Sequence, residues 1–68
     1  MAESLDKRLA AFLRKQRGEQ SYAVFSKRLG ITASSLFRLE NCQQSITLGK
    51  LEAILDRLRC RLEDVFGG

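Results

Sequence analysis

The sequence contains no histidine, no proline and no tryptophan, and only two of its 68 residues are cysteines. Without a histidine, neither Cys42 nor Cys60 has an imidazole base for nucleophilic catalysis, and no third cysteine is present to complete a zinc site. The sequence also lacks a glycine-rich phosphate loop and a pair of carboxylates at a useful spacing. We therefore expect a protein that is not an enzyme, with no metal, cofactor or small-molecule ligand.

Long apolar stretches are also missing. No run approaches the roughly eighteen residues of a membrane-spanning helix, and the first residues, MAESLDKR, lack the apolar segment of a signal peptide. Two cysteines at a loose spacing are typical of reduced thiols in a cytosolic protein. We therefore expect a cytoplasmic protein with no membrane partner.

What the chain does contain is the composition of a globular protein with a basic excess. Hydrophobic residues make up 44% and charged residues 29%, and the formal net charge is +4. The length predicts one small domain over residues 1–68, with frayed ends at 1–3 and 67–68. A basic balance favours a polyanionic partner, and the positive excess lies in the N-terminal two thirds of the chain.

Apolar spacing and capping residues predict five short helices and an all-α fold. Ser4, Ser21, Thr32 and Thr47 are side chains of the type that caps helix N-termini. The predicted helices cover residues 5–17, 22–29, 33–41, 48–59 and 62–66. The apolar residues that we expect to face the core are Leu5, Leu9, Phe12, Leu13, Phe25, Leu29, Leu36, Leu39, Leu48, Leu51, Ile54, Leu55, Leu58, Leu62, Val65 and Phe66.

The second and third of these helices have the pattern of a helix-turn-helix over about residues 21–41. Gly30 stands where the turn needs a left-handed residue, and Ser26 is a small residue where the two helices would cross. Apolar residues on both sides of the turn can clamp the pair from beneath. This spacing assigns Ser26 and Gly30 to structural roles.

The stretch FSKRLGITASSLFRLEN (25–41), together with ITL at 46–48 and LEDVF at 62–66, resembles the phage repressor and Cro-type (XRE-like) helix-turn-helix family. The resemblance implies a compact five-helix, lambda-repressor-like domain that binds double-stranded DNA as a homodimer, with its third helix in the major groove. It also implies that Glu40 pairs with a basic residue of the first helix. For this structural pair we expect Arg14.

Three positions depart from the family pattern. Tyr22 stands where a glutamine is usual, although a phenol can also donate to a phosphate oxygen. Cys42 stands where a glycine commonly ends the third helix, so we expect Asn41 to take the left-handed conformation instead. Arg59 stands where a glycine often closes the fourth helix.

By position, the resemblance places Ala33, Ser34, Phe37 and Arg38 against the bases. Arg38 can donate two hydrogen bonds to a guanine, and Ala33 and Phe37 can contact thymine methyl groups. Two other interpretations stay open: Phe37 beside Val24 can form an apolar patch for a protein partner, or its neighbours can cover it so that it reads nothing. The predicted phosphate contacts are Tyr22, Lys27, Arg28 and Lys50.

These observations leave two functions open. The first is a sequence-specific DNA-binding transcriptional regulator, repressor-like, that forms a homodimer. The second is a protein-interaction module on the same fold, for example an antitoxin-like protein that binds a partner. For the subunit contact of a homodimer, the expected residues are Arg59, Cys60, Val65 and Phe66.

Overall fold

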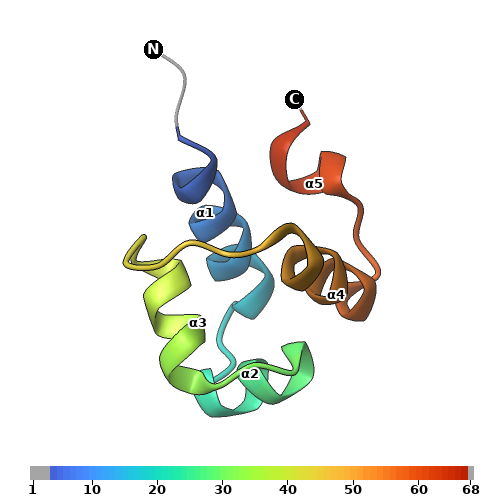
Figure 1. Cartoon of the computed structure of the whole chain (residues 1–68). Coiled ribbons are helices and arrows are strands. Elements are labelled where there is room, and N and C mark those ends of the chain that lie inside the picture. Colours follow the sequence, from blue (N-terminus) through green and yellow to red (C-terminus); the bar gives the residue numbers. More distant parts are fainter. Residues whose placement is uncertain (1–3, 68) are drawn as a thin grey trace.

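The computed structural model describes residues 4–67, and five α-helices account for most of this range. They are α1 (Leu5–Arg17), α2 (Tyr22–Leu29), α3 (Ala33–Glu40), α4 (Leu48–Leu58) and α5 (Leu62–Phe66). The described residues contain no strand, so the predicted all-α fold is confirmed. In Figure 1, α1 runs through the middle of the molecule and packs against both α3 and α5, while α2 packs against α3 and α4.

The first four helices begin at the capping residues that the sequence predicted. Ser4, Ser21, Thr32 and Thr47 each accept a hydrogen bond from the backbone N–H three residues further along, at 3.0–3.3 Å. Each cap satisfies a backbone donor that the helix itself leaves free, and a cap of this type typically contributes about 1 kcal/mol. The helix starts are therefore fixed by local hydrogen bonds.

Three helices end at a residue in the left-handed conformation: Gly30 (φ 75°), Cys42 (φ 56°) and Arg59 (φ 55°). After each of them, the next backbone N–H donates to a carbonyl five residues earlier, at 2.8–3.0 Å. This is the bond that closes a Schellman motif. The expectation for Asn41 is wrong, because Asn41 has a φ of −107° and the left-handed residue is Cys42.

One hydrophobic core joins all five helices. Its buried members are Leu9, Phe12, Leu13, Phe25, Leu29, Leu36, Leu39, Leu51, Ile54, Leu55, Leu58 and Val65. Three predicted core residues are exposed instead: Leu5 to 64%, Leu48 to 81% and Leu62 to 54%. Each is the first residue of its helix, so it has the right helical spacing but lies at an end of the element, beyond the packed stretch.

The predicted fraying concerns residues that the structure describes only in part. Residues 1–3 and 68 lie outside the described range. Gly67 follows α5 directly, and its N–H donates to the carbonyl of Glu63 at 2.8 Å. Within residues 4–67, no helix has both the length and the apolar character needed to cross a membrane.

Candidate nucleic-acid interface

The turn between α2 and α3 holds the two helices at a fixed angle. Ser26 is buried, its hydroxyl donates to the carbonyl of Ala23 at 3.1 Å, and its own carbonyl accepts from the N–H of Ile31. Gly30 takes the left-handed conformation, and a Cβ at this position would lie 2.9 Å from Cζ of Arg57. The turn therefore needs glycine for its backbone conformation, and Arg57 of α4 fills the space beside it.

The four residues predicted to face the bases lie together on the exposed side of α3. Ala33, Ser34, Phe37 and Arg38 line one shallow recess with Tyr22 of α2 and Gln43 from the segment after α3. We call this surface the α3 recess. Phe37 is 47% exposed, so its neighbours cover about half of the ring and the rest is accessible. Helical spacing explains the grouping, since positions i, i+1, i+4 and i+5 share one face.

Tyr22 supports Phe37 from the α2 side. Their ring centroids are 5.8 Å apart in an edge-to-face arrangement, and the guanidinium of Arg17 lies 4.3 Å from the centroid of the Tyr22 ring. Both geometries are favourable for aromatic rings. The neighbour of Phe37 in the α3 recess is thus Tyr22, and Val24, exposed elsewhere on α2, does not line the recess.

A buried carboxylate lies behind these rings. The side chain of Glu40 has no exposed surface, and Arg17 donates to it twice, from Nε to Oε2 at 2.9 Å and from a terminal nitrogen to Oε1 at 3.0 Å. Arg14, the predicted partner, approaches Glu40 only to 3.9 Å and its side chain is 58% exposed. Arg17 is therefore the principal partner, and the assignment to Arg14 is corrected.

The ion pair between Arg17 and Glu40 also reaches Tyr22. The phenol oxygen of Tyr22, predicted to contact a phosphate, lies 3.5 Å from Oε1 of Glu40. Hydrogen bonding to Glu40 raises the pKa of the Arg17 guanidinium above its ordinary value, so Arg17 is charged at neutral pH. Among the described residues, no buried polar side-chain atom lacks a hydrogen-bond partner. A satisfied polar cluster of this kind fixes where the C-terminal end of α3 sits on α1.

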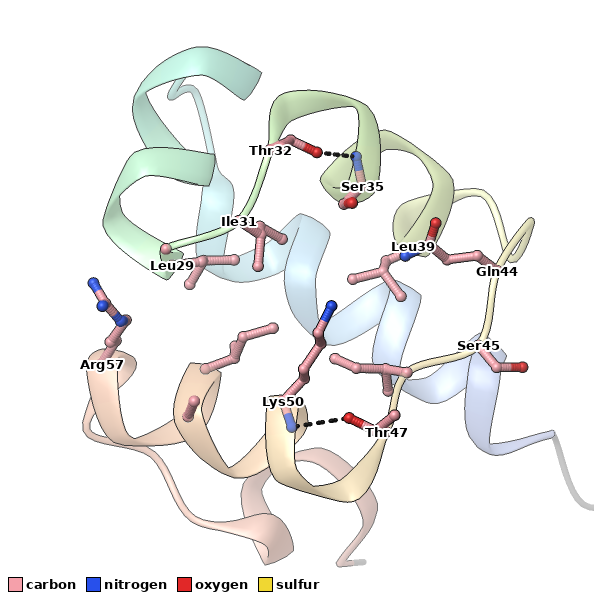
Figure 2. Close-up of a pocket in the computed structure, with 14 residues that line it drawn as sticks. Leu29, Ile31, Thr32, Ser35, Leu39, Gln44, Ser45, Thr47, Lys50 and Arg57 are labelled. Carbon is pink, nitrogen blue, oxygen red and sulfur yellow. Dashed lines mark hydrogen bonds between the residues drawn. The ribbon is translucent and has the colours of Figure 1, made fainter.

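A second hollow, the α3–α4 groove, separates the helix-turn-helix from α4. It has a volume of about 440 Å³, and it is lined by residues 29–32, Ser35 and Leu39 on one side and by residues 44–47 and one flank of α4 on the other. In Figure 2, Lys50 extends from α4 toward α3, and Arg57 stands at the other end of the groove beside Leu29. Lys50 and Arg57 are the charged residues of the lining, which includes no acidic residue.

The two flanks of α4 differ in charge. Lys50 and Arg57 face the α3–α4 groove, whereas Glu52 and Asp56 line a different groove between α4 and α5. Positions 50 and 57 are seven residues apart, two helical turns, and therefore share a face. The side of α4 next to the helix-turn-helix is basic, and the side away from it carries the acidic residues.

The remaining predicted phosphate contacts do not join either hollow. Lys27 and Arg28 are exposed on α2, and neither lines the α3 recess or the α3–α4 groove. Sequence reasoning missed two residues that do: Gln43 in the recess and Arg57 in the groove. The polar pair Gln43–Gln44 between two helices was a signal for the first, and the spacing of Arg57 from Lys50 was a signal for the second.

Comparison with known proteins gives one match. A family model described as Cro/C1-type HTH DNA-binding domain matches residues 8–67. No curated protein and no solved structure matches the chain at a significant level. The matched range begins within α1 and includes both helices of the turn, the α3 recess and all of α4 and α5.

Proposed function

Because the chain belongs to the Cro/C1-type HTH DNA-binding domain family, we propose that it is a sequence-specific, repressor-like transcriptional regulator. In this proposal it acts in the cytoplasm as a homodimer and occupies an operator, with α3 in the major groove. The observation that carries the proposal is the common position of Arg38, Ser34, Phe37 and Ala33 in the α3 recess.

The side chains of the α3 recess suit base recognition. Arg38 has the fork of donors that matches O6 and N7 of guanine, and Ser34 can donate to or accept from a base or a phosphate. Ala33 and Phe37 offer apolar surface to thymine methyl groups. Tyr22, whose phenol is turned to Glu40, acts in this proposal by positioning Phe37.

The basic flank of α4 supports DNA over an uncharged partner for this side of the molecule. Lys50 and Arg57 lie next to the helix-turn-helix without an acidic residue in the same groove, and phosphate contacts need positive charge beside the reading helix. Lys27 and Arg28 on α2 are the further phosphate contacts of the proposal. Phosphate contacts from both α2 and α4 would hold α3 between them in a defined register.

The test is a fluorescence-anisotropy titration of labelled random duplex DNA across a salt series. Loss of the Arg38 contact in Arg38→Ala is expected to weaken binding, and it costs about 1–3 kcal/mol of discrimination once an operator has been selected. Three or four phosphate contacts per subunit predict a slope of about −5 to −7 for log K against log salt concentration in a dimer.

Lys7→Ala is the matched control. It also removes one positive charge, but Lys7 lies in the first turn of α1, at the end of the molecule where Arg8 bonds to Phe66 of α5. Its binding curve should therefore stay close to that of the wild type. Absence of binding even at low salt, with folded protein, would overturn the proposal and favour a protein partner that docks on Phe37.

A further inference from the structure

We propose that the face formed by α4 and α5 is a self-complementary surface through which two copies of this chain associate. The inference rests on the proposed function for the need of a dimer, since one small module covers only about 600–1,000 Å² of DNA-contacting surface. It goes beyond that function by assigning the surface and the charge pairs across it. Its observations are independent of the α3 recess.

Two of the most exposed large apolar side chains border one groove on this face. Leu48 begins α4 and is 81% exposed, and Leu62 begins α5 and is 54% exposed. Both line a groove of about 410 Å³ between the two helices, whose floor includes Leu51 and Leu55. Burial of one fully exposed leucine side chain is worth about 1.5–3 kcal/mol, so this arrangement favours a protein that covers both.

The charges of this groove fit a second copy of the same chain. Glu52 and Asp56 line one side and Arg61 lines the other, so the surface carries both signs. Under a two-fold axis each residue of such a surface meets the residue that its counterpart meets, which lets Arg61 of each copy face the acidic pair of the other. The side chain of Arg61 is 84% exposed, and its contact with Glu63 is a long one at 3.5 Å, which leaves it available.

The same charges argue against other occupants. Glu52 and Asp56 repel nucleic acid, and a partner of one charge sign would match only half of the rim. The position is also compatible with DNA binding, because this flank of α4 is the one that faces away from the α3–α4 groove. A standard interface needs about 800 Å² per partner. Against the 4910 Å² accessible surface of the chain this is about one sixth, and a whole side of the molecule is required.

The association differs from the one expected from the sequence. Val65 is buried in the core and Phe66 is partly covered against it, so these two residues mainly close the domain of their own chain. Cys60 lines the groove, and Leu48 and Leu62 take the places of exposed anchors. The proposed contact therefore lies on the α4–α5 groove instead of on the C-terminal residues themselves.

Charge reversal with sedimentation equilibrium of the full chain tests the proposal. The wild type is expected to show a concentration-dependent dimer, and Arg61→Glu and the double variant Glu52→Lys/Asp56→Lys are each expected to weaken dimerisation at least tenfold by placing like charges opposite each other. The chain that combines all three changes restores the opposite-charge pairs and should regain most of the affinity. Such a rescue occurs only when the partner of each copy is an identical copy.

Leu48→Glu and Val24→Glu form the second matched pair. Both place a carboxylate at an exposed apolar position, but Val24 lies on α2, away from the α4–α5 groove, and its variant should dimerise as the wild type does. Circular dichroism shows that each variant is folded. A wild type that stays monomeric at every concentration, a Leu48→Glu chain that dimerises normally, or a triple variant that shows no rescue would overturn the proposal.

The DNA titration separates this inference from the proposed function. A monomeric wild type that still binds random duplex DNA in a salt-dependent manner would contradict the α4–α5 interface and leave the DNA-binding proposal standing. A dimeric wild type that binds no DNA would do the reverse.

Discussion

Glu40 connects the core of this protein to the surface that we propose reads DNA. Its carboxylate accepts two hydrogen bonds from Arg17, and the phenol of Tyr22 lies 3.5 Å from it. The guanidinium of Arg17 covers one face of the Tyr22 ring, and the ring in turn contacts Phe37 in the α3 recess. A change at a buried residue can therefore alter the position of a residue that contacts a base.

Glu40→Gln tests the structural part of this cluster. The amide keeps the shape but removes the charge, and it cannot accept two hydrogen bonds from one guanidinium in the same way. We expect a fall in Tm of several degrees, since 1 kcal/mol corresponds to about 4–8 °C in a domain of this size. Thermal melts by circular dichroism measure it. Glu19→Gln, on the exposed loop after α1, is the control and should melt with the wild type; equal Tm values for all three would contradict the role of Glu40.

Phe37→Ala tests the methyl contacts proposed for the α3 recess. The wild type should bind alternating dA–dT duplex more tightly than the matching dA–dU duplex, which lacks only the thymine methyl groups. One buried methyl or methylene group is worth about 0.8 kcal/mol, which corresponds to about a fourfold difference per contact. The variant should bind both duplexes with nearly equal affinity in competition anisotropy. No preference in the wild type would show that Phe37 does not contact thymine methyl groups.

The helices of this protein are defined by their ends more than by their lengths. Side-chain caps begin four of them, and three are closed by Schellman hydrogen bonds after a left-handed residue. Only one of these three residues, Gly30, is a glycine. Cys42 and Arg59 adopt a backbone conformation that costs an ordinary residue about 1–2 kcal/mol, and the closing hydrogen bonds offset this cost.

Cys42→Gly and Asn41→Gly should therefore change stability in opposite directions. Glycine at position 42 relieves the left-handed strain, and we expect a gain of up to about 1 kcal/mol. Glycine at position 41 removes the side chain whose Nδ2 donates to the carbonyl of Phe37 at 2.8 Å, and it adds chain entropy, so the free energy of unfolding should fall. Urea denaturation followed by circular dichroism gives both values. A destabilised Cys42→Gly chain would contradict the assignment of strain to this residue.

At the scale of the whole molecule, α4 separates two surfaces of different charge. Lys50 and Arg57 lie on the flank next to the helix-turn-helix, and Glu52 and Asp56 lie on the flank next to α5. The net charge of +4 thus gives only the average of two unlike sides. This arrangement lets one side bind a polyanion while the other contacts a protein of mixed charge.

Leu48→Glu should consequently change the salt dependence of DNA binding. If the α4–α5 groove forms the dimer, the variant binds as a monomer with half the number of phosphate contacts. Its slope of log K against log salt concentration should fall to about half of the wild-type value, from about −5 to −7 to about −3. Anisotropy titrations of both proteins in the same buffers measure the difference. An unchanged slope would mean that the variant still binds DNA as the wild type does.

Local patterns in the sequence were sufficient for most of the fold. Capping serines and threonines act within three residues of their own position, and the glycine of the turn acts through its own backbone, so the helix starts and the helix-turn-helix could be predicted without knowing the packing. The grouping of Ala33, Ser34, Phe37 and Arg38 followed in the same way from helical periodicity. These features depend on short-range interactions that the sequence shows directly.

The tertiary structure decided which of several equivalent residues is used. Arg14 and Arg17 are three residues apart on α1, and only the position of the end of α3 against α1 selects Arg17 for Glu40. Leu48 has the spacing of a core residue, yet it is exposed because no other helix reaches the beginning of α4. Arg57 lies beside Gly30 because α4 packs against α2. Such choices depend on contacts between residues distant in the chain, and helical periodicity carries no information about which elements meet or how far each extends.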